Sequence, residues 1–286
     1  MSQVRILTDS NAYLPADIIE EHGIVVIPHQ IGLGKHVLAE TPELTVEDLF
    51  QEFSQAQSKG FKGMPRLLVP DINMVLDHYR LLAKETNQIL AIHASSHLSP
   101  MWGQSRKAAE LLMGRNTIRV IDSLSTSLGQ GLLVRQAAEA AAAGASIHEI
   151  ARLVNSAVPH LYVTLFTESL NYLETSANLG VSQSVLGTML GIKAMLTVEE
   201  GDLIPLEKVQ TREEVVEKLY EFVVEFANIE ELGILQHAYE ESQGELLARL
   251  EENMPKLKIH SLTYPPSLAA HLGPNTVGVI VYEGNV

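Results

Sequence analysis

Short apolar runs alternate, over the first half of the chain, with longer segments in which apolar residues recur every three or four positions. The short runs are rich in β-branched residues and apolar on both faces, which is typical of strands covered by helices on each side. These strands are predicted at Val4–Thr8, Ile24–Pro28, Ile89–Ala94 and Thr117–Ile121. The longer segments have the period of amphipathic helices. They lie at Pro15–His22, Val46–Gln57, Asn73–Thr86 and Gln104–Met113. The alternation predicts an α/β fold with a parallel sheet between two layers of helices.

Local signals mark where several helices begin and end. Asp71 is well placed to cap the helix that follows it. The run Gly131–Ala143 consists almost entirely of good helix formers and ends at Gly144, which is typical of a helix C-terminus. Ser146 and Glu149 have the spacing of a capping box, so a further helix is expected from Ser146 to Ala157.

The pattern changes around Pro159, where we place a domain boundary. The second half is predicted to contain mainly strands, with two helices at Thr211–Ala227 and Glu245–Glu252. A polar stretch runs up to Leu190. Its predicted strands are Leu161–Phe166, Ala194–Val198, Leu203–Leu206, Leu232–Gln236, Lys258–Leu262 and Thr276–Tyr282. We therefore expect two α/β domains. Residues 1–158 would form a three-layer domain with a parallel sheet, and residues 159–286 a domain with a mixed sheet and helices.

Composition narrows the class of protein. Lys and Arg total 20 against 35 Asp and Glu, a net charge of −15, which disfavours nucleic acid and anionic membrane surfaces as partners. The absence of cysteine excludes disulfides and thiolate chemistry. No signal peptide is visible, and the two long uncharged stretches are too polar or too rich in proline to cross a bilayer. We expect a soluble, acidic, cytoplasmic protein without stable membrane insertion.

Polar residues gather where the predicted strands end, at Asp9 and Ser10, at Ser95 and Ser96, and at Asp122 onward. In an open α/β sheet, ligands bind at the carboxyl ends of the strands. Hydroxyls and backbone N–H groups near helix starts hold an anion without a basic side chain. Ser95 and Ser96 are therefore candidate ligand contacts. Asp9 and Ser10 also fit a purely structural role as helix caps and turn residues.

The histidines suggest little chemistry on their own. His271 lies between apolar residues, so a buried structural role is the simpler interpretation, and His93 is expected to pack inside a strand. The histidines are scattered singly, which gives no support for a metal site. No nucleophile elbow or phosphate-binding loop is present. A triad of Ser95, His271 and Asp9 can be drawn, although nothing in the spacing requires it.

Taken together, these segments resemble the DegV family over essentially the whole chain. Each motif is loose alone, but six in the right order form a specific signal. They are Thr8–Pro15, Val25–Pro28, Ser95–Ser99, Ile121–Ser123 with Ser127–Gly131, Gly191–Lys193, and His271–Pro274.

The resemblance implies a two-domain protein that buries an acyl chain between its domains and catalyses no reaction itself. By the same resemblance, Ser95 or Ser96 and His271 bind the carboxylate. The expected ligand is a long-chain fatty acid such as palmitate, stearate or oleate, with no cofactor and no metal. Some family members are the acyl-carrying subunit of a bacterial fatty acid kinase, so an ATP-dependent kinase subunit is an expected partner.

The chain departs from the family where further carboxylate ligands are expected. Two hydroxyl residues are replaced by Leu67 and Leu68, and Trp102 stands in place of a tyrosine, which makes the mouth of the site more apolar. An arginine expected near residue 176 is missing. Lys193 is kept, and Arg66 is a further candidate for holding the ligand head group.

Two alternatives stay open. One is a small-molecule hydrolase or transferase that uses Ser95 or Ser96 as a nucleophile with His271 as the base. The other is a paralogue in which the altered motifs bind another lipid or no lipid.

Overall fold

The computed structural model of the chain describes residues 3–112, 114, 116–175 and 193–284. It confirms the predicted α/β class, with one parallel sheet and one mixed sheet. Most of the polar stretch predicted to run up to Leu190, and Gly191 and Ile192 of the fifth motif, lie outside the described residues. In the part that is described, no helix is long and apolar enough to cross a membrane.

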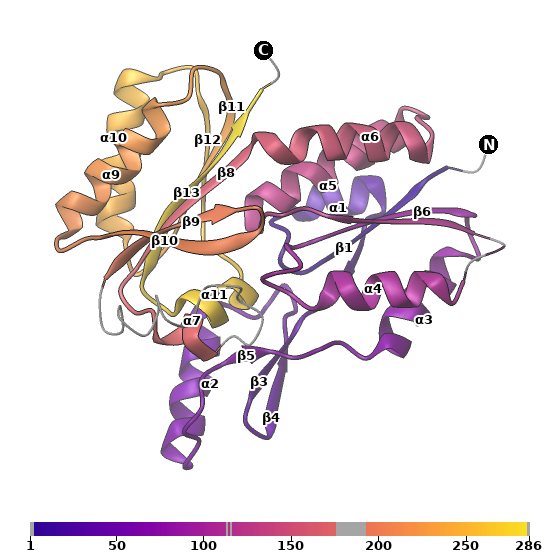
Figure 1. Cartoon of the computed structure of the whole chain (residues 1–286), viewed down its shortest axis with the longest axis horizontal. Helices are drawn as coiled ribbons and strands as arrows, with labels where there is room; N and C mark the ends of the chain where they lie inside the picture. The colour runs from indigo at the N-terminus through magenta and orange to yellow at the C-terminus, as the bar shows by residue number, and fades with distance from the viewer. Residues whose placement is uncertain (1–2, 113, 115, 176–192, 285–286) are drawn as a thin grey trace.

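The parallel sheet has the strand order β2-β1-β6-β7 (Figure 1). Its strands are β1 (Arg5–Asp9), β2 (Val25–Ile27), β6 (Gln88–His93) and β7 (Thr117–Asp122). The chain leaves β1 for β2 on one side and later returns to β6 on the other. The carboxyl ends of β1 and β6 therefore flank the point where the strand order reverses, which is where open α/β sheets bind ligands.

Helices cover both faces of the parallel sheet, as the apolar pattern predicts. Helices α3 (Ile72–Leu82) and α4 (Met101–Glu110) form a core on one face, and α5 (Ser127–Ala142) and α6 (Ile147–Ala157) form a core on the other. The predicted caps are confirmed: the Asp71 side chain accepts a hydrogen bond at the start of α3, and a capping box of Ser146 and Glu149 begins α6. The short helix α1 (Ala16–His22) contacts α5.

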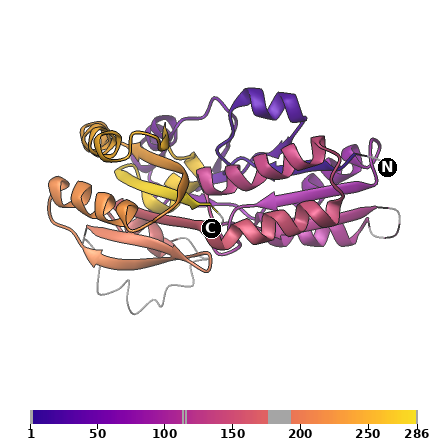
Figure 2. The same ribbon diagram turned by 90° about the horizontal axis from the view of Figure 1, so that it is seen from above.

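The mixed sheet has the order β10-β9-β8-β13-β11-β12, in which only β11 and β12 run parallel. Its strands are β8 (Leu161–Thr167), β9 (Ala194–Glu199), β10 (Asp202–Lys208), β11 (Ile229–His237), β12 (Lys258–Leu262) and β13 (Thr276–Glu283). Helices α9 (Arg212–Val224) and α10 (Glu240–Asn253) cover its outer face. Figure 2 shows the two large sheets side by side, with these two helices at the far end of the mixed sheet.

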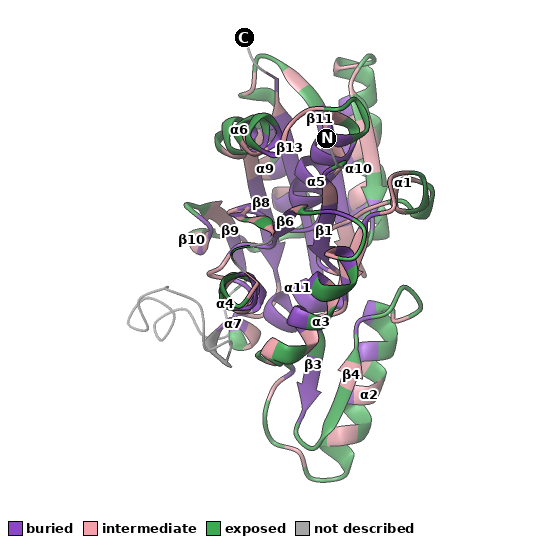
Figure 3. Ribbon diagram, turned by 90° about the vertical axis from the view of Figure 1, so that its right-hand side faces the viewer, coloured by how far each residue is buried: buried purple, intermediate pink, exposed green. Residues whose placement is uncertain are grey.

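A small antiparallel sheet was not predicted. Strands β3 (Gln30–Leu33), β4 (His36–Ala39) and β5 (Arg66–Leu67) pair in the order β4-β3-β5. With helix α2 (Val46–Ser58) they extend away from the two large sheets (Figure 3). Strands of two to four residues carry too few positions to show an alternating pattern, so the sequence gives little sign of them.

The turn predicted around His271 is a helix, α11 (Pro266–Leu272), and every residue in it is buried. Pro266 at the first turn and Gly273 at the C-cap, with φ of 82°, are the residue types that start and stop a helix. The short helices α7 (Asn171–Thr175) and η1 (Val158–His160) complete the described elements. Because α11 contacts α2, β3 and β5, it joins the end of the chain to the small sheet.

One apolar core connects the two large sheets. Helix α5 packs against β1 and β6 of the parallel sheet and against β8 and β13 of the mixed sheet. The approach is close: a Cβ at Gly233 on β11 would lie 2.4 Å from Cδ2 of Leu128 in α5. The chain crosses from one sheet to the other near residue 158, and the division into two domains there stays a prediction, since this core belongs to both halves.

Candidate functional site

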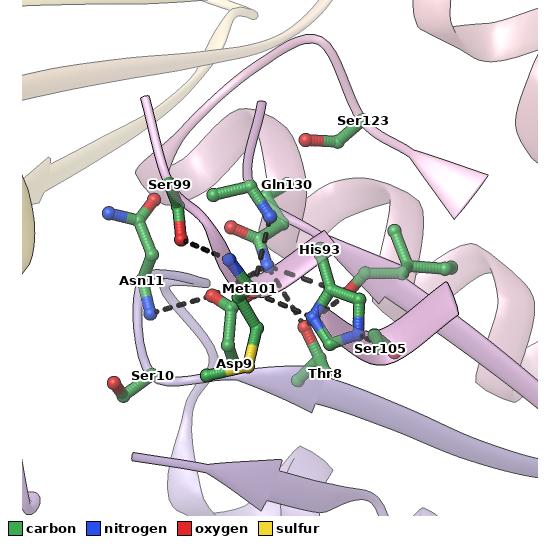
Figure 4. A network of polar contacts seen from close by, with 12 residues as sticks. Thr8, Asp9, Ser10, Asn11, His93, Ser99, Met101, Ser105, Ser123 and Gln130 are labelled. Atoms are coloured by element: carbon green, nitrogen blue, oxygen red, sulfur yellow. Dashed lines mark hydrogen bonds and ion pairs between the residues drawn. The ribbon is translucent and has the colours of Figure 1, made fainter. Parts of the chain in front are cut away.

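Asp9 is the centre of a polar network at the carboxyl edge of the parallel sheet (Figure 4). Its Oδ1 accepts hydrogen bonds from the backbone N–H of Asn11 and from Nε2 of Gln130, each at 3.1 Å. Its Oδ2 lies 2.8 Å from Nδ1 of His93 and accepts the N–H of Ala94 at 3.2 Å. Both oxygens of this fully buried carboxylate therefore have two partners each.

The partners of Asp9 keep it ionised. Burial alone raises the pKa of this carboxyl, but nearby His29 and the hydrogen bonds from His93 and Gln130 outweigh burial and lower the pKa to about 2. His93 also lies 2.7 Å, through Nε2, from Oγ of Ser105, which is 2.5 Å from the hydroxyl of Tyr79. Asp9, His93 and Ser105 have the connectivity of a catalytic triad, and all three are 0% exposed; the binding role expected for Asp9 stays a prediction.

A second buried cluster surrounds His29, directly after β2. Its Nδ1 lies 3.2 Å from Oγ of Ser10 and 3.5 Å from Oε2 of Glu40, and its Nε2 lies 2.8 Å from Oγ of Ser99. Ser10 in turn donates its hydroxyl hydrogen to the Glu40 carboxylate. Burial lowers the pKa of His29, but the carboxylates of Asp9 and Glu40 outweigh it, so the pKa is raised above its usual value.

Helix α11 closes this cluster from the far end of the chain. The backbone N–H of Ser267 donates to Oε1 of Glu40 at 2.6 Å, and Oγ of Ser267 accepts a hydrogen bond from Nδ2 of Asn11 at 2.8 Å. These contacts fix α11 against residues that follow β1 and β4. His271, one turn further along the helix, is thereby brought to the carboxyl edge of the parallel sheet.

His271 differs from the other buried histidines because neither of its ring nitrogens has a hydrogen-bond partner among the described residues. Its side chain lies beside the carbonyl of Leu98 and is only 3% exposed as a residue. Burial lowers its pKa to about 4 against the opposing effect of the Leu98 carbonyl, with a smaller contribution from nearby His29, so the imidazole is neutral near pH 7. A neutral imidazole has one N–H to donate and one nitrogen to accept, and burial without either bond is costly.

The structure places the serine pair in the loop after β6. The hydroxyl of Ser95 donates to the carbonyl of Gly201 at 2.7 Å, at the tip of the β9–β10 hairpin. The backbone N–H of Ser96 donates to the carboxylate of Asp122 at 3.2 and 3.3 Å. The conceivable triad of Ser95, His271 and Asp9 is wrong, because Asp9 bonds His93 and the Ser95 hydroxyl bonds a backbone carbonyl.

The predicted apolar and basic residues lie on β5, directly after it, and in α4. Leu67 pairs with Ile31 on β3, and Leu68 packs on Gly32; both leucines are half-buried. Arg66 is exposed on β5. The half-buried Trp102 lies in the first turn of α4, where the Arg106 guanidinium stacks 4.9 Å from its ring centroid. The binding roles expected for Leu67, Leu68, Arg66 and Trp102 stay predictions.

Lys193 lies directly before β9 and is ion-paired with Glu168. Its exposed ammonium lies 3.4 Å from Oε1 of Glu168, which also accepts the Tyr239 hydroxyl at 2.6 Å, while Oε2 of Glu168 accepts Nδ2 of Asn275 at 3.0 Å. The hydrogen bond from Tyr239 is the largest of the causes that lower the pKa of Glu168. Glu168 borders a pocket of about 280 Å³ whose other lining residues are Met64, Thr167, Ser169, Asn171, Tyr172, Leu272, Pro274 and Asn275.

Sequence reasoning missed His29, Glu40 and Ser99. His29 follows a predicted strand directly, so the rule that singled out Asp9 and Ser95 also applies to it. Ser99 ends the Ser95–Ser99 motif, in which the strand-end rule points only to the first two serines. Glu40 had no local signal, because β4 and α11 bring it to the cluster. In the described part of the chain, no group of three or more His, Asp or Glu side chains could hold a metal ion.

The chain is thus a two-sheet α/β protein. Its parallel and mixed sheets share one core, and a buried polar site lies where the strand order of the parallel sheet reverses. The family model described as "Uncharacterised protein, DegV family" matches residues 3–284, so the chain belongs to the DegV family, and the resemblance is confirmed.

Relatives agree over the full length. A DegV domain-containing protein of Streptomyces coelicolor is 28% identical over 282 residues, which cover 97% of this chain and 98% of that protein. A fatty acid binding DegV family protein of Streptococcus agalactiae superimposes with a TM-score of 0.88 at 23% identity, covering 100% of both chains. The fatty acid kinase (Fak) B3 protein of Streptococcus pneumoniae, loaded with linoleic acid, has a TM-score of 0.81 at 18% identity, covering 99% of this chain and 100% of that one. These structures confirm the fold.

Proposed function

We propose that this protein binds one long-chain fatty acid between its two sheets, without catalysing a reaction on it. The carboxylate would lie at the edge formed by the Ser95–Ser99 loop and α11. The observation that carries the proposal is His271: a neutral imidazole buried at the ligand-binding edge of the sheet, beside the Leu98 carbonyl but with no hydrogen bond of normal geometry to either ring nitrogen among the described residues. A carboxylate oxygen would accept the N–H that this ring has to donate.

The surroundings of His271 suit an acyl chain. Leu98, Leu268 and Leu272 belong to the apolar core that joins the two sheets. Burying a sixteen-carbon chain at about 0.8 kcal/mol per methylene is worth about 12 kcal/mol before ordering costs, so apolar contact would be the main source of affinity for such a ligand. Support also comes from the structural neighbours, one of which is described as fatty acid binding and another as loaded with linoleic acid.

The neighbour from the fatty acid kinase suggests a role for the bound lipid. We propose that this chain presents the carboxylate to a separate ATP-dependent kinase subunit, and that the site works in the cytoplasm, where ATP is available. The expected division at residue 158 would put the acyl chain at the junction of the two domains. Lys193 is ion-paired with Glu168, and the part expected for it in holding the ligand head group stays a prediction.

Native mass spectrometry of the purified protein, with extraction of its lipid, tests the proposal. We expect one palmitate, stearate or oleate for each chain, and uptake of labelled oleate after the lipid is removed. Replacing Ser95 and Ser96 together by alanine should weaken binding more than Ser127→Ala, a matched change in a buried serine at the start of α5. Empty protein that also takes up no labelled palmitate or oleate would contradict the proposal.

The same preparation tests the hydrolase alternative. A fluorophosphonate probe labels a serine only if a base activates it. Because the Ser95 hydroxyl donates to Gly201 and no hydrogen bond joins it to His271 within the described residues, we expect no labelling of Ser95 or Ser96.

A further inference from the structure

Helices α9 and α10 lie side by side on the outer face of the mixed sheet (Figure 1). Helix α9 ends at Val224, shortly before β11, and α10 ends at Asn253, shortly before β12. Because β11 and β12 run parallel, the two helix ends meet at the edge where these strands begin. Strand β11 is nine residues long, about 30 Å, and His237 at its other end donates to the carbonyl of Pro274, just after α11. The two helix ends therefore lie far from the edge proposed for the fatty acid.

A cavity of about 430 Å³ lies between the two helix ends. Its inner wall is made of half-buried apolar side chains that pack on the core of the mixed sheet, those of Phe226, Ile229, Met254 and Leu257. Its exposed rim is made of Ala227, Pro255 and Lys256. The ring of Phe226 is held by two neighbours, with ring centroids 4.7 Å from Tyr162 and 5.2 Å from Phe222. The wall is thus fixed before anything binds, and the space is in the size range of pockets that take a ligand.

The charge at these helix ends is negative and uncompensated. A helix has a partial negative charge at its C-terminus, which a basic residue in the last turn stabilises. Neither α9 nor α10 has a basic residue there. The lining is flanked in the sequence by exposed glutamates that have no ion pair within the described part of the chain: Glu225, Glu230, Glu251 and Glu252. They outnumber Lys256, the cation on the rim, so the surroundings of the cavity favour a positively charged ligand.

The negative charge continues along both helices away from the cavity. Helix α9 has 13 residues and α10 has 14, so each is about 20 Å long. Their exposed surface carries further glutamates: Glu213, Glu217, Glu221, Glu240, Glu241 and Glu245. Of the cations on these helices, Arg249 pairs with Glu217, and Lys218 lies 3.2 Å from Glu207. A small cation would meet only one end of this surface, whereas a chain with several basic side chains would meet all of it.

We propose that the cavity between the ends of α9 and α10 is a docking site for a basic, amphipathic segment of a partner protein. The segment inserts a bulky apolar side chain against Phe226 and Met254, and its lysine or arginine side chains pair with the glutamates around the cavity. The inference goes beyond the proposed function, because the cavity and the turn after α11 lie at opposite ends of β11. Docking here does not require a bound lipid.

The test uses two synthetic peptides that carry a fluorophore. The first has tryptophan and leucine at its centre, with lysines on both sides, and the second has glutamates in place of the lysines. Fluorescence polarisation measures their binding to the purified protein. We expect the lysine peptide to bind, with an affinity that falls as the salt concentration rises from about 0.1 M to 1 M, because salt screens exposed charges. The glutamate peptide should not bind.

Variants of the protein locate the bound peptide. Ala227→Trp fills the cavity from its exposed rim and should lower the affinity by roughly a hundredfold, since the apolar side chain no longer inserts. Glu251→Lys combined with Glu252→Lys should lower it roughly tenfold, since attraction becomes repulsion. The matched control is Glu110→Lys, an exposed glutamate that likewise lies in the last turn of a helix, α4. Its affinity for the lysine peptide should equal that of wild type.

Three outcomes would overturn the inference: equal binding of the two peptides, wild-type affinity in Ala227→Trp, or an equal loss in Glu110→Lys. Urea denaturation shows whether each variant is folded. If Ala227→Trp does not fold, the double glutamate variant decides, and wild-type affinity in that variant overturns the inference. Dodecylamine, a small cation with one apolar arm, tests the choice of a polypeptide. We expect it to compete weakly, and binding as tight as that of the lysine peptide would overturn that choice.

Discussion

Two aspartate–histidine pairs in this protein have the same separation and different surroundings. Nδ1 of His93 lies 2.8 Å from Oδ2 of Asp9, and Nδ1 of His97, four residues along the chain, lies 2.8 Å from Oδ1 of Asp202. The first pair is 0% exposed on both side chains, whereas in the second the histidine is 41% exposed and the aspartate 26%. Distance alone gives no reason to rank one pair above the other.

Burial separates the two pairs. Asp9 has exchanged water for four hydrogen-bond donors, and the loss of any of them leaves a charge in the interior without a replacement. The side chains of Asp202 and His97 are partly exposed, so water screens their attraction more than it screens the buried pair. Two ion pairs with the same separation therefore contribute unequally to the free energy of unfolding. The following experiments measure the difference.

The largest effect is expected from Asp9→Asn. The amide would present hydrogens to the N–H of Ala94, which then loses its acceptor, and the charge that faces His29 and His93 disappears. Breaking a buried pair in this way costs about 3–5 kcal/mol. Urea denaturation at pH 7 measures the change, and a variant within about 1 kcal/mol of wild type would show that the buried network matters little.

A smaller effect is expected from His271, which is buried without a partner. Its pKa is about 4 in the folded protein and 6.5 in an ordinary setting, so the unfolded chain binds the extra proton between these values. The free energy of unfolding should fall by about 3 kcal/mol as the pH drops from about 6.5 to 4. His29 does not obscure this window, because its raised pKa removes stability only as the pH rises above 6.5.

Urea denaturation at pH 7 and at pH 4.5 checks this dependence in lipid-free protein. In His271→Gln the difference between the two pH values should shrink by most of that amount. The exposed His148 offers the matched control, His148→Gln, which should leave the difference as in wild type. An unchanged difference in His271→Gln would mean that the imidazole is already solvated in the folded state.

Most of the fold could be predicted because a helix that is buried on one face repeats its apolar residues at a regular spacing. Segments such as Val46–Ser58 and Ile147–Ala157 present one apolar face, and their ends carry caps that are local in sequence. Helix α11 escaped prediction for the opposite reason: it is buried on all sides, so no polar face marks its period, and its prolines resemble a turn. The small sheet escaped because its strands are too short to show alternation.

The candidate site, like the fold, could be predicted only in part. Asp9, Ser95 and His93 could be placed because they end strands, and strand ends of a parallel sheet meet at one edge. The partners that decide their chemistry could not. Glu40 and Ser267 are separated by 227 positions in the sequence and meet only after α11 folds against β4. A residue's position can be predicted from its own strand, but its pKa and its hydrogen-bond partners depend on the whole chain.

The smallest effect is expected from Asp202→Asn. The exposed pair with His97 should contribute less than about 1 kcal/mol to the free energy of unfolding, and less still at 1 M salt. A double-mutant cycle with His97→Gln isolates the pair from the other contacts of each residue, because the coupling that remains belongs to the two side chains alone. A coupling as large as the loss in Asp9→Asn would refute the comparison, since burial would then not be what makes the Asp9 pair stronger.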